Sequence, residues 1–266
     1  MARTAFIIGG TGMIGIATAA ELLRAGWRVT LSHTGKRPAE NVPAGAEIVA
    51  LDRGDTEALR SALGTGADAL IDMVAFNGAH GDQLLSLADL TGILAVISSA
   101  SVYADPQGRS LDTAGETGFP EFAGPIRETA ATIEPGTGSY SRAKVELEQH
   151  LAGATRPVTI LRPCAIHGIN AKHPREWWFV KRMLDGRSRV PLAGGGGALF
   201  HTTASINLAR AIRATIDTPA TRVLNCGDPD APSLLEIGEA LASQLDWAGA
   251  FVPVPADSPI GQTPWS

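Results

Sequence analysis

Short apolar runs alternate along the chain with longer stretches in which apolar residues recur every three or four positions. The apolar runs predict β-strands at 4–8, 28–32, 47–51, 67–76, 93–98, 157–161 and 221–225. The longer stretches predict helices at 13–25, 56–63, 81–90, 138–152, 204–217 and 233–245. Strands that alternate with helices indicate βαβ units, so we expect an α/β protein with a doubly wound parallel sheet, the Rossmann fold.

Two segments interrupt this alternation. Residues 104–137 are rich in proline, glycine and glutamate and are too long for an ordinary connection, which is typical of a functional loop. Residues 163–203 follow no regular pattern except for a predicted helix at 175–185. We expect a core of residues 1–163 and about 204–227, with residues 164–203 and 228–266 forming a small lobe. The lobe should lie over the carboxyl ends of the strands, where ligands bind in such sheets.

The composition excludes several classes of protein. Hydrophobic residues make up 44% and charged residues 18% of the 266 residues, which does not fit a disordered chain. The net charge is −5 and there is no basic block, so no nucleic-acid partner is expected. Two cysteines, Cys164 and Cys226, are too few for a disulfide scaffold. Because no signal peptide and no apolar stretch of membrane-spanning length is found, we expect a cytoplasmic protein without a membrane partner.

A glycine motif follows the first predicted strand. Gly9, Gly12 and Gly15 form G-x-x-G-x-x-G between that strand and the first predicted helix. Glycines let the backbone turn tightly and approach a pyrophosphate, whose charge the helix N-terminus favours. The alternative is a glycine-rich turn without a ligand. The position between strand and helix favours a dinucleotide site.

Tyr140 and Lys144 lie four residues apart in a predicted helix, within the segment YSRAK. At this spacing both side chains point from one helix face. A lysine charge near the phenol is expected to lower the pKa of Tyr140, which would make the phenol an acid/base group near neutral pH. The alternative is a surface pair without a function.

A hydroxyl-rich segment, ISSASVY at 97–103, directly follows the fifth predicted strand. Hydroxyls at the carboxyl end of a central strand face the expected ligand crevice. One of them could hydrogen-bond a substrate oxygen as charge develops on it. A turn that merely ends the strand is an equal alternative for this segment taken alone.

These three motifs, in this order, resemble the extended short-chain dehydrogenase/reductases, the NAD-dependent epimerase/dehydratase family. The likeness covers nearly the whole chain, since LRPCAIHG, FHTTASINLARAI and LNCGDP are also similar to later family segments. It implies an enzyme with a catalytic triad of Ser99, Tyr140 and Lys144. The cofactor-binding residues expected from the motifs and the resemblance are Gly9, Thr11, Gly12, Met13, Ile14, Gly15, His33, Lys36, Arg37, Asp52, Arg53, Val74, Ala75, Tyr140, Lys144, Pro163 and Ile166.

The resemblance also assigns roles within that set. Asp52 matches the family residue that contacts the adenine amino group, while Val74 and Ala75 should lie near the ribose and phosphates. Pro163 and Ile166 should lie near the nicotinamide.

Substrate contacts are expected in the lobe and beside the serine segment. The candidates are Ser101, His167, Arg175, Trp178 and His201. Lobe packing is an equal alternative for the tryptophans at 177 and 178. His167 and His173 are six residues apart, but no cysteine or carboxylate completes a set with them, so no metal is expected.

Some positions depart from the family pattern. His167, Ile169 and Asn207 stand where the family usually has tyrosine, proline and aspartate. Ser99 is followed by Ala100 and Ser101, without the Asp-Glu pair that family dehydratases use for elimination. Sugar-nucleotide dehydration is therefore disfavoured. Family members also run beyond the end of this chain, so a truncated C-terminus stays open.

The end of the second predicted strand indicates NADP as the cofactor, with NAD as the alternative. An NAD site needs an acidic residue there for the ribose hydroxyls, and this chain has His33 instead. Lys36 and Arg37 are near enough in sequence to bind a 2′-phosphate.

The sequence thus predicts an NADP(H)-dependent reductase or dehydrogenase acting on a small-molecule ketone or secondary alcohol. The main alternative is an NAD-dependent nucleotide-sugar epimerase. Two further alternatives are a dinucleotide-sensing regulator, which the Tyr140/Lys144 pair disfavours, and an RNA-associated Rossmann protein. The segment VTLSHTGKRP resembles chloroplast stem-loop RNA-binding relatives, but the net charge of −5 counts against RNA. A homodimer stays open.

Overall fold

The computed structural model describes residues 2–36 and 39–265 of the chain. Within them, seven parallel strands form one sheet in the order β10-β6-β5-β4-β1-β2-β3. The strands are β1 (Thr4–Ile8), β2 (Arg28–His33), β3 (Glu47–Ala50), β4 (Ala67–Asp72), β5 (Thr91–Ile97), β6 (Val158–Pro163) and β10 (Arg222–Cys226). The doubly wound parallel sheet predicted from the sequence is confirmed.

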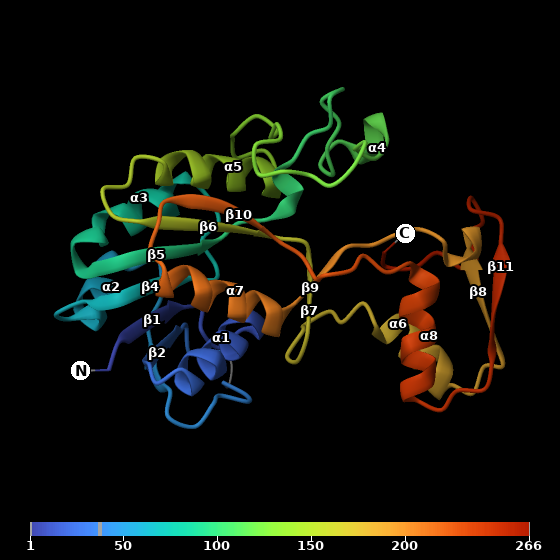
Figure 1. Ribbon diagram of the computed structural model, residues 1–266, viewed down its shortest axis with the longest axis horizontal. Helices are drawn as coiled ribbons and strands as arrows, with labels where there is room; N and C mark the ends of the chain where they lie inside the picture. The colour runs from blue at the N-terminus through green and yellow to red at the C-terminus, as the bar shows by residue number, and fades with distance from the viewer. Residues whose placement is uncertain (1, 37–38, 266) are drawn as a thin grey trace.

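Helices cover both faces of this sheet, which makes three layers (Figure 1). On one face lie α1 (Met13–Arg24) and α7 (Ser205–Asp217), and on the other lie α2 (Thr56–Leu63), α3 (Gly78–Ser86) and α5 (Tyr140–Leu151). The single-turn helices η1 (Ala88–Leu90) and η2 (Ala100–Val102) flank β5. The central strands β1, β4 and β5 are mostly apolar because both of their faces are buried.

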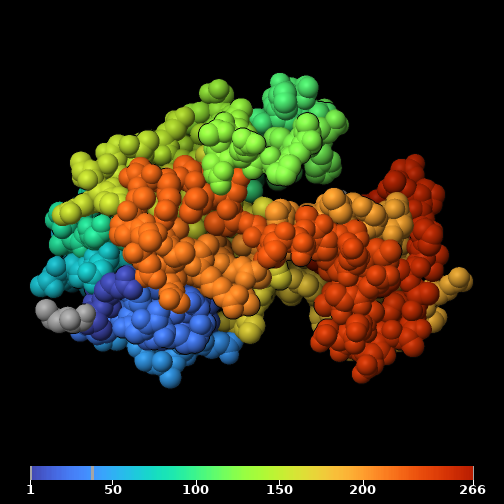
Figure 2. All heavy atoms as spheres, viewed as in Figure 1, coloured from blue at the N-terminus to red at the C-terminus, as the bar shows by residue number. Residues whose placement is uncertain are grey.

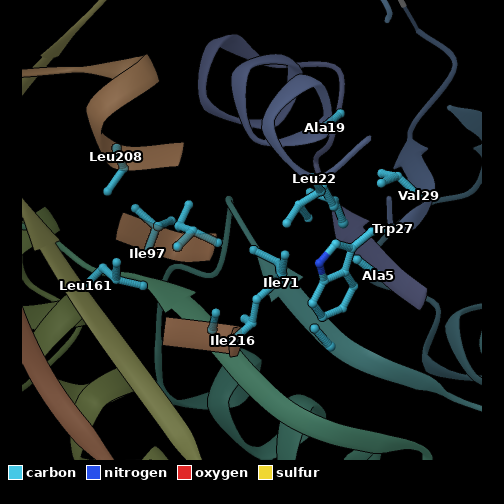
Figure 3. Close-up of a cluster of buried hydrophobic side chains, with 14 of the residues drawn as sticks. Ala5, Ala19, Leu22, Trp27, Val29, Ile71, Ile97, Leu161, Leu208 and Ile216 are labelled. Atoms are coloured by element: carbon cyan, nitrogen blue, oxygen red, sulfur yellow. The ribbon is translucent and has the colours of Figure 1, made fainter. Parts of the chain in front are cut away.

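Each face of the sheet has its own apolar cluster. Under α1 and α7, Leu22 and Leu208 point toward Ile71 and Ile97 of the central strands (Figure 3). On the opposite face, side chains of α2, α3 and α5 pack against alternate residues of the same strands. Burial of this apolar area is the main force that holds the layers together.

The direction of the strand order reverses between β1 and β4. From β1 the chain proceeds to β2 and β3 on one side, and from β4 to β5, β6 and β10 on the other. At such a switch point the carboxyl ends of neighbouring strands leave a crevice for a ligand. The glycine loop at 9–12 and the turn at 73–76 flank the crevice in this chain.

The turn at 73–76 corrects the sequence prediction, which extended the fourth strand to residue 76. The structure ends β4 at Asp72. The Asp72 carboxylate accepts hydrogen bonds from the backbone N–H groups of Val74 and Ala75, at 2.8 and 2.7 Å. Amides bound to a side chain cannot also continue a ladder, so the backbone turns away from the sheet.

A smaller body extends from the carboxyl end of the sheet (Figure 1). It contains α6 (Trp177–Leu184), β8 (Arg189–Ala193), the turn η3 (Gly194–Gly196), α8 (Leu234–Gln244) and β11 (Ala250–Val254). β8 and β11 pair in parallel, and Phe179, Leu192 and Trp265 belong to its separate apolar cluster. The short strands β7 (Ala165–His167) and β9 (Thr202–Ala204) pair where the chain enters and leaves it.

The sequence predicted only one helix between residues 163 and 203, and that prediction is incomplete. Three of the strands, β7, β8 and β9, lie there. Each pairs with a strand that is distant in sequence or too short to have a recognisable pattern. Proline within β8 and β11, at Pro191 and Pro253, further weakens the strand signal.

The segment 104–137 projects from the core beside the smaller body. It contains one short helix, α4 (Ala114–Thr117). The buried Asp105 carboxylate holds it by accepting from the backbone N–H groups of Gln107, Arg109 and Glu121. In the space-filling view the surface is hollowed between this green segment and the orange-red smaller body (Figure 2).

A buried polar network anchors the far end of that segment. Arg162 pairs with Glu148, and their side chains are 6% and 9% exposed. Arg162 also donates to the Tyr103 phenol at 2.8 Å, which donates to Asn225 on β10 at 2.6 Å. Asn225 in turn donates to the Ile126 carbonyl from its side chain and to the Glu128 carboxylate from its backbone. Residues far apart in sequence thus fix one another through satisfied hydrogen bonds.

Two kinds of feature are absent from the described residues. Among residues 2–36 and 39–265 no helix combines the length and the apolar character needed to cross a membrane. The same residues contain no group of three or more metal-ligating side chains that could hold an ion.

Candidate active site

The glycine loop is packed so closely that side chains would not fit. A Cβ on Gly15 would lie 2.4 Å from the Gly10 carbonyl oxygen, and one on Gly9 would lie 2.7 Å from Val74. Gly9 also has a φ of +72°, which glycine adopts without strain. The helix α1 begins at Met13, and among the described residues no side chain caps its N-terminus. The positive end of the helix dipole is therefore available to an anion. The loop therefore fits a pyrophosphate.

The ends of β2 and β3 form the neighbouring part of the crevice. His33 is the last residue of β2, and its Nδ1 accepts from the Gly35 backbone N–H at 3.3 Å. Lys36 is exposed, while Arg37 lies outside the described residues. Asp52 follows β3 and accepts from the Gly54 backbone N–H at 3.0 Å. Among the described residues, no carboxylate lies at the end of β2, the position expected to select between NAD and NADP.

Arg53, expected among the cofactor contacts, is paired with Asp72. Its Nη1 donates to Asp72 at 2.7 Å, and the two side chains are 13% and 0% exposed. Its Nη2 donates to the Gln83 side chain at 2.6 Å. Val74 and Ala75 do lie beside the glycine loop, through the contact of Val74 with Gly9.

Ser99 and Tyr140 come together from different elements. Ser99 follows β5 and precedes η2, and Tyr140 is the first residue of α5. The Ser99 hydroxyl interacts with the phenol and acts to lower the pKa of Tyr140, against the larger effect of burial. The Tyr140 ring is half exposed and packs against Phe76, with the ring centroids 5.7 Å apart. A phenol that is half exposed and lies beside a serine hydroxyl can exchange a proton with a ligand oxygen.

Lys144 lies one turn further along α5 and is 4% exposed. Its ammonium donates to the carbonyl oxygens of Ala75 and Ile97, at 2.6 and 2.8 Å. Burial lowers its pKa to about 8, although the charges of Asp72 and Glu148 oppose the shift. The ammonium is thereby fixed between the ends of β4 and β5.

The prediction that Lys144 lowers the pKa of the Tyr140 phenol is wrong for the isolated chain. Burial raises the pKa of Tyr140 above its usual value, and the hydrogen bond with Ser99 only partly opposes this. The Lys144 nitrogen lies 5.6 Å from the centre of the tyrosine ring and is bound to two carbonyls. Its charge is therefore directed at backbone oxygens and not at the phenol.

The buried lysine gives a testable pH dependence of stability. The folded-state pKa of Lys144, about 8, is below the ordinary 10.5, so between these values the unfolded chain binds more protons than the folded one. Relative to Lys144→Met, the wild-type free energy of unfolding should therefore rise by about 2–3 kcal/mol between about pH 7 and about pH 10. Urea unfolding at both pH values measures it. If the free energies of unfolding of wild type and Lys144→Met change equally between the two pH values, the pKa of Lys144 is not lowered in the folded protein.

The first turn of α5 is tied to the serine segment. Ser139 caps the helix, accepting from the Arg142 backbone N–H at 3.3 Å. The Ser141 hydroxyl lies 2.9 Å from that of Ser101, and Ser101 donates its backbone N–H to Ser99 at 3.1 Å. Both Ser139 and Ser141 donate to Asp112 of the 104–137 segment. Ser101, expected at the substrate, thus lies within the hydroxyl network beside Tyr140.

The candidate substrate residues His167 and His201 meet at Asp228, which the sequence reasoning missed. His167 Nε2 lies 3.1 Å from the Asp228 carboxylate, and His201 Nε2 lies 2.8 Å from its carbonyl oxygen. Hydrogen bonds from Ala204, Asn207, Thr202 and His167 outweigh burial and lower the pKa of Asp228 to about 2. Its place directly after a strand, within LNCGDP, was the available signal.

The tryptophans at 177 and 178 have different surroundings. Trp178 packs in the cluster of the smaller body, edge-on to Phe179 and with Arg182 3.7 Å from its ring centre. Trp177 is 52% exposed and lines a cavity of about 540 Å³ together with Lys172, His173, Pro174, Arg175 and Pro264. Arg175 also borders a smaller cavity shared with Ile166 and His167. The substrate candidate Trp178 thus packs within the smaller body, and its contact with a substrate stays a prediction.

Comparisons with known proteins agree with this architecture. A dTDP-glucose 4,6-dehydratase from Bacillus anthracis, in complex with NAD, has a TM-score of 0.74 at 17% identity, covering 95% of this chain and 85% of that one. A UDP-glucose 4-epimerase from Thermus thermophilus, also with NAD, has 0.72 at 18%, covering 99% and 90%. WbmG from Bordetella bronchiseptica, with NAD and UDP, has 0.72 at 16%, covering 97% and 84%. A comparison with curated proteins gave no match.

The family assignment rests on the sequence itself. The model of the NAD dependent epimerase/dehydratase family matches residues 5–227, from β1 to the end of the last strand of the sheet. The match includes the glycine loop, the serine segment and the Tyr140/Lys144 pair. The chain therefore belongs to the NAD dependent epimerase/dehydratase family.

Proposed function

We propose that the chain is an NADP(H)-dependent reductase or dehydrogenase that acts on a small-molecule ketone or secondary alcohol. The observation that carries the proposal is the meeting of Ser99, Tyr140 and Lys144 at the carboxyl end of the sheet. In this proposal residues 1–163 and about 204–227 bind the dinucleotide. Residues 164–203 and 228–266 bind the substrate.

Ser99, Tyr140 and Lys144 each have a separate role in the proposed reaction. When bound, the nicotinamide supplies or accepts the hydride and, when oxidised, adds a positive charge near the phenol. In reduction Tyr140 gives its phenolic proton to the substrate oxygen, and in oxidation it takes that proton back. The Ser99 hydroxyl orients the same oxygen by a hydrogen bond. Lys144 holds the ribose hydroxyls with the N–H that its two backbone carbonyls leave available.

The dinucleotide is held at several points along the crevice. The glycine loop and the N-terminus of α1 bind the pyrophosphate, with Thr11, Met13 and Ile14 contributing from the first turn. Asp52 contacts the adenine, and Pro163 and Ile166 border the nicotinamide. A preference for NADP is supported by His33 at the end of β2, where an NAD site would have a carboxylate.

We predict that NADP(H) binds at least about tenfold more tightly than NAD(H), since one charge-assisted hydrogen bond contributes about 1.5–3 kcal/mol. Dissociation constants measured by fluorescence titration of both reduced cofactors test this. His33→Asp should reverse the preference by repelling the 2′-phosphate. Lys36→Ala should weaken NADPH binding and leave NADH binding unchanged. Equal or tighter binding of NADH by the wild type would overturn the prediction.

A nucleotide-sugar epimerase is the second candidate. The cavity at Trp177 favours it, since Lys172 and Arg175 offer charges for a diphosphate and the indole offers a surface for a base. Both WbmG, solved with UDP, and a UDP-glucose 4-epimerase share the fold. An epimerase returns the hydride to the opposite face of the keto intermediate and consumes no cofactor.

One experiment separates the two candidates. NADPH absorbance is followed with a panel of small ketones and aldehydes, and UDP- and dTDP-sugars are incubated in parallel and analysed by chromatography for epimers. Carbonyl-dependent loss of NADPH absorbance supports the reductase. Epimers that form without NADPH consumption would replace the reductase by the epimerase.

A further inference from the structure

The turn at 73–76 touches both side chains that are proposed to carry the chemistry. The Ala75 carbonyl accepts from the Lys144 ammonium at 2.6 Å. The next residue, Phe76, packs its ring against that of Tyr140. The preceding residue, Val74, packs on the glycine loop at Gly9. A displacement of this one turn would therefore move the lysine, the tyrosine and the wall of the dinucleotide crevice together.

Asp72 is what shapes the turn. One of its carboxylate oxygens, Oδ1, accepts from the backbone N–H groups of both Val74 and Ala75. The other, Oδ2, accepts from Arg53 at 2.7 Å. The carboxylate is fully buried, and it directly follows the buried apolar residues Ala69, Leu70 and Ile71 of β4. A buried charge needs such partners to be tolerated, so the three donors and the carboxylate form one unit.

Arg53 is itself locked in place from the side away from the crevice. Its second amino group donates to the Gln83 side chain of α3 at 2.6 Å. The Gln83 amide donates back to the Arg53 carbonyl at 2.7 Å and to Thr56 at 3.0 Å. His80 of α3 accepts the Phe76 backbone N–H at 2.9 Å and fixes the far end of the turn. The turn is thus held at both ends by side chains from α2 and α3 and the loop before α2.

We propose that Asp72, held by Arg53, is a positioning residue that sets the place of the Lys144 ammonium and the Tyr140 ring through the turn at 73–76. Neither Asp72 nor Arg53 touches the reacting atoms in this proposal. They act through Ala75 and Phe76. The proposal rests on the proposed roles of Tyr140 and Lys144.

The charges of Asp72 and Arg53 also act on the Lys144 ammonium. Four charged or titratable groups face the ammonium: Asp72 at the end of β4, Arg53 after β3, His80 on α3 and Glu148 on its own helix. The carboxylates favour the protonated lysine, and Arg53 disfavours it. Loss of Asp72 and loss of Arg53 should therefore change the pKa of Lys144 in opposite directions. A role in folding alone gives no reason for opposite signs.

The test titrates Lys144 directly by NMR of protein labelled with 13C at the lysine ε-carbon. The chain has four lysines, so the spectrum is simple, and Lys144→Arg identifies the resonance. Relative to the wild-type midpoint of about 8, Asp72→Asn should lower the midpoint and Arg53→Gln should raise it, each by roughly 1 pH unit. Arg53→Lys, which keeps the charge, should stay near the wild-type midpoint. Asp89→Asn, in the exposed Arg60–Asp89 pair, is the matched control and should change nothing.

The outcomes decide the proposal independently of the substrate. Shifts of the same sign in Asp72→Asn and Arg53→Gln, or no shift in folded variants, would overturn it. If Asp72→Asn does not fold, the comparison of Arg53→Gln with Arg53→Lys still decides the sign. Asp72→Asn should also weaken NADPH binding, whereas Asp89→Asn should not. If Lys144 titrates as expected but no carbonyl or sugar is converted, the proposed function fails while the positioning role stands.

Discussion

Replacing Tyr140 with phenylalanine should lower kcat by about 10²–10⁴-fold, the usual contribution of a positioned proton donor. The phenol hydroxyl is removed while the ring stays against Phe76, so the dissociation constant for NADPH should stay nearly unchanged. Steady-state kinetics, together with a fluorescence titration of NADPH, measures both quantities. The enzyme should be assayed with whichever substrate the carbonyl or sugar panel identifies.

Lys144→Ala is the contrasting variant. It removes a ribose contact as well as the buried ammonium, so both kcat and NADPH affinity should fall. Ser99→Ala should reduce kcat by a smaller factor, since the phenol remains. A Tyr140→Phe enzyme that retains the wild-type kcat would rule out Tyr140 as the proton donor.

Arg162→Met should lower the free energy of unfolding by about 3–5 kcal/mol. The change leaves the Glu148 carboxylate buried with only the Ser98 hydroxyl, at 2.5 Å, among the side-chain partners described here. It also removes a donor from the Tyr103 phenol. Equilibrium unfolding in urea measures the loss.

Two comparisons make this result specific. Glu148→Leu combined with Arg162→Met should recover part of the loss, because no unpaired charge remains buried. Arg60→Met breaks the exposed pair with Asp89 and should leave the unfolding midpoint unchanged. An Arg162→Met protein as stable as Arg60→Met would mean that water reaches Glu148 and solvates it.

The elements with local signals were predictable from the sequence. The helix at 56–63 was placed at its observed bounds, since Asp55 caps its N-terminus and Gly64 follows its end with a positive φ. The central strands of the large sheet were found because burial on both faces makes them mostly apolar. β8 and β11 were missed because each is defined by its partner, and the partner lies far away in sequence.

The same distinction applies to the candidate site. Tyr140 and Lys144 are recognisable by their spacing, and the structure places both at the crevice. Asp72, Arg53 and Asp228 act through partners on other elements, which spacing along one segment does not reveal. The direction of the Tyr140 pKa was also beyond the sequence, because it depends on how deeply the phenol is buried.

The late position of β10 has a consequence for synthesis on the ribosome. Residues 104–137 emerge early, but Asn225, which binds Tyr103, Ile126 and Glu128, is made only after the whole of β7–β9. Until then β6 is an open edge of the nascent sheet, with backbone groups free to pair with another chain. A growing polypeptide that stalls before Arg222 therefore lacks the Asn225 contacts of this segment and carries an aggregation-prone edge at β6. Pairing of β10 covers the β6 edge and supplies the Asn225 contacts in the same step.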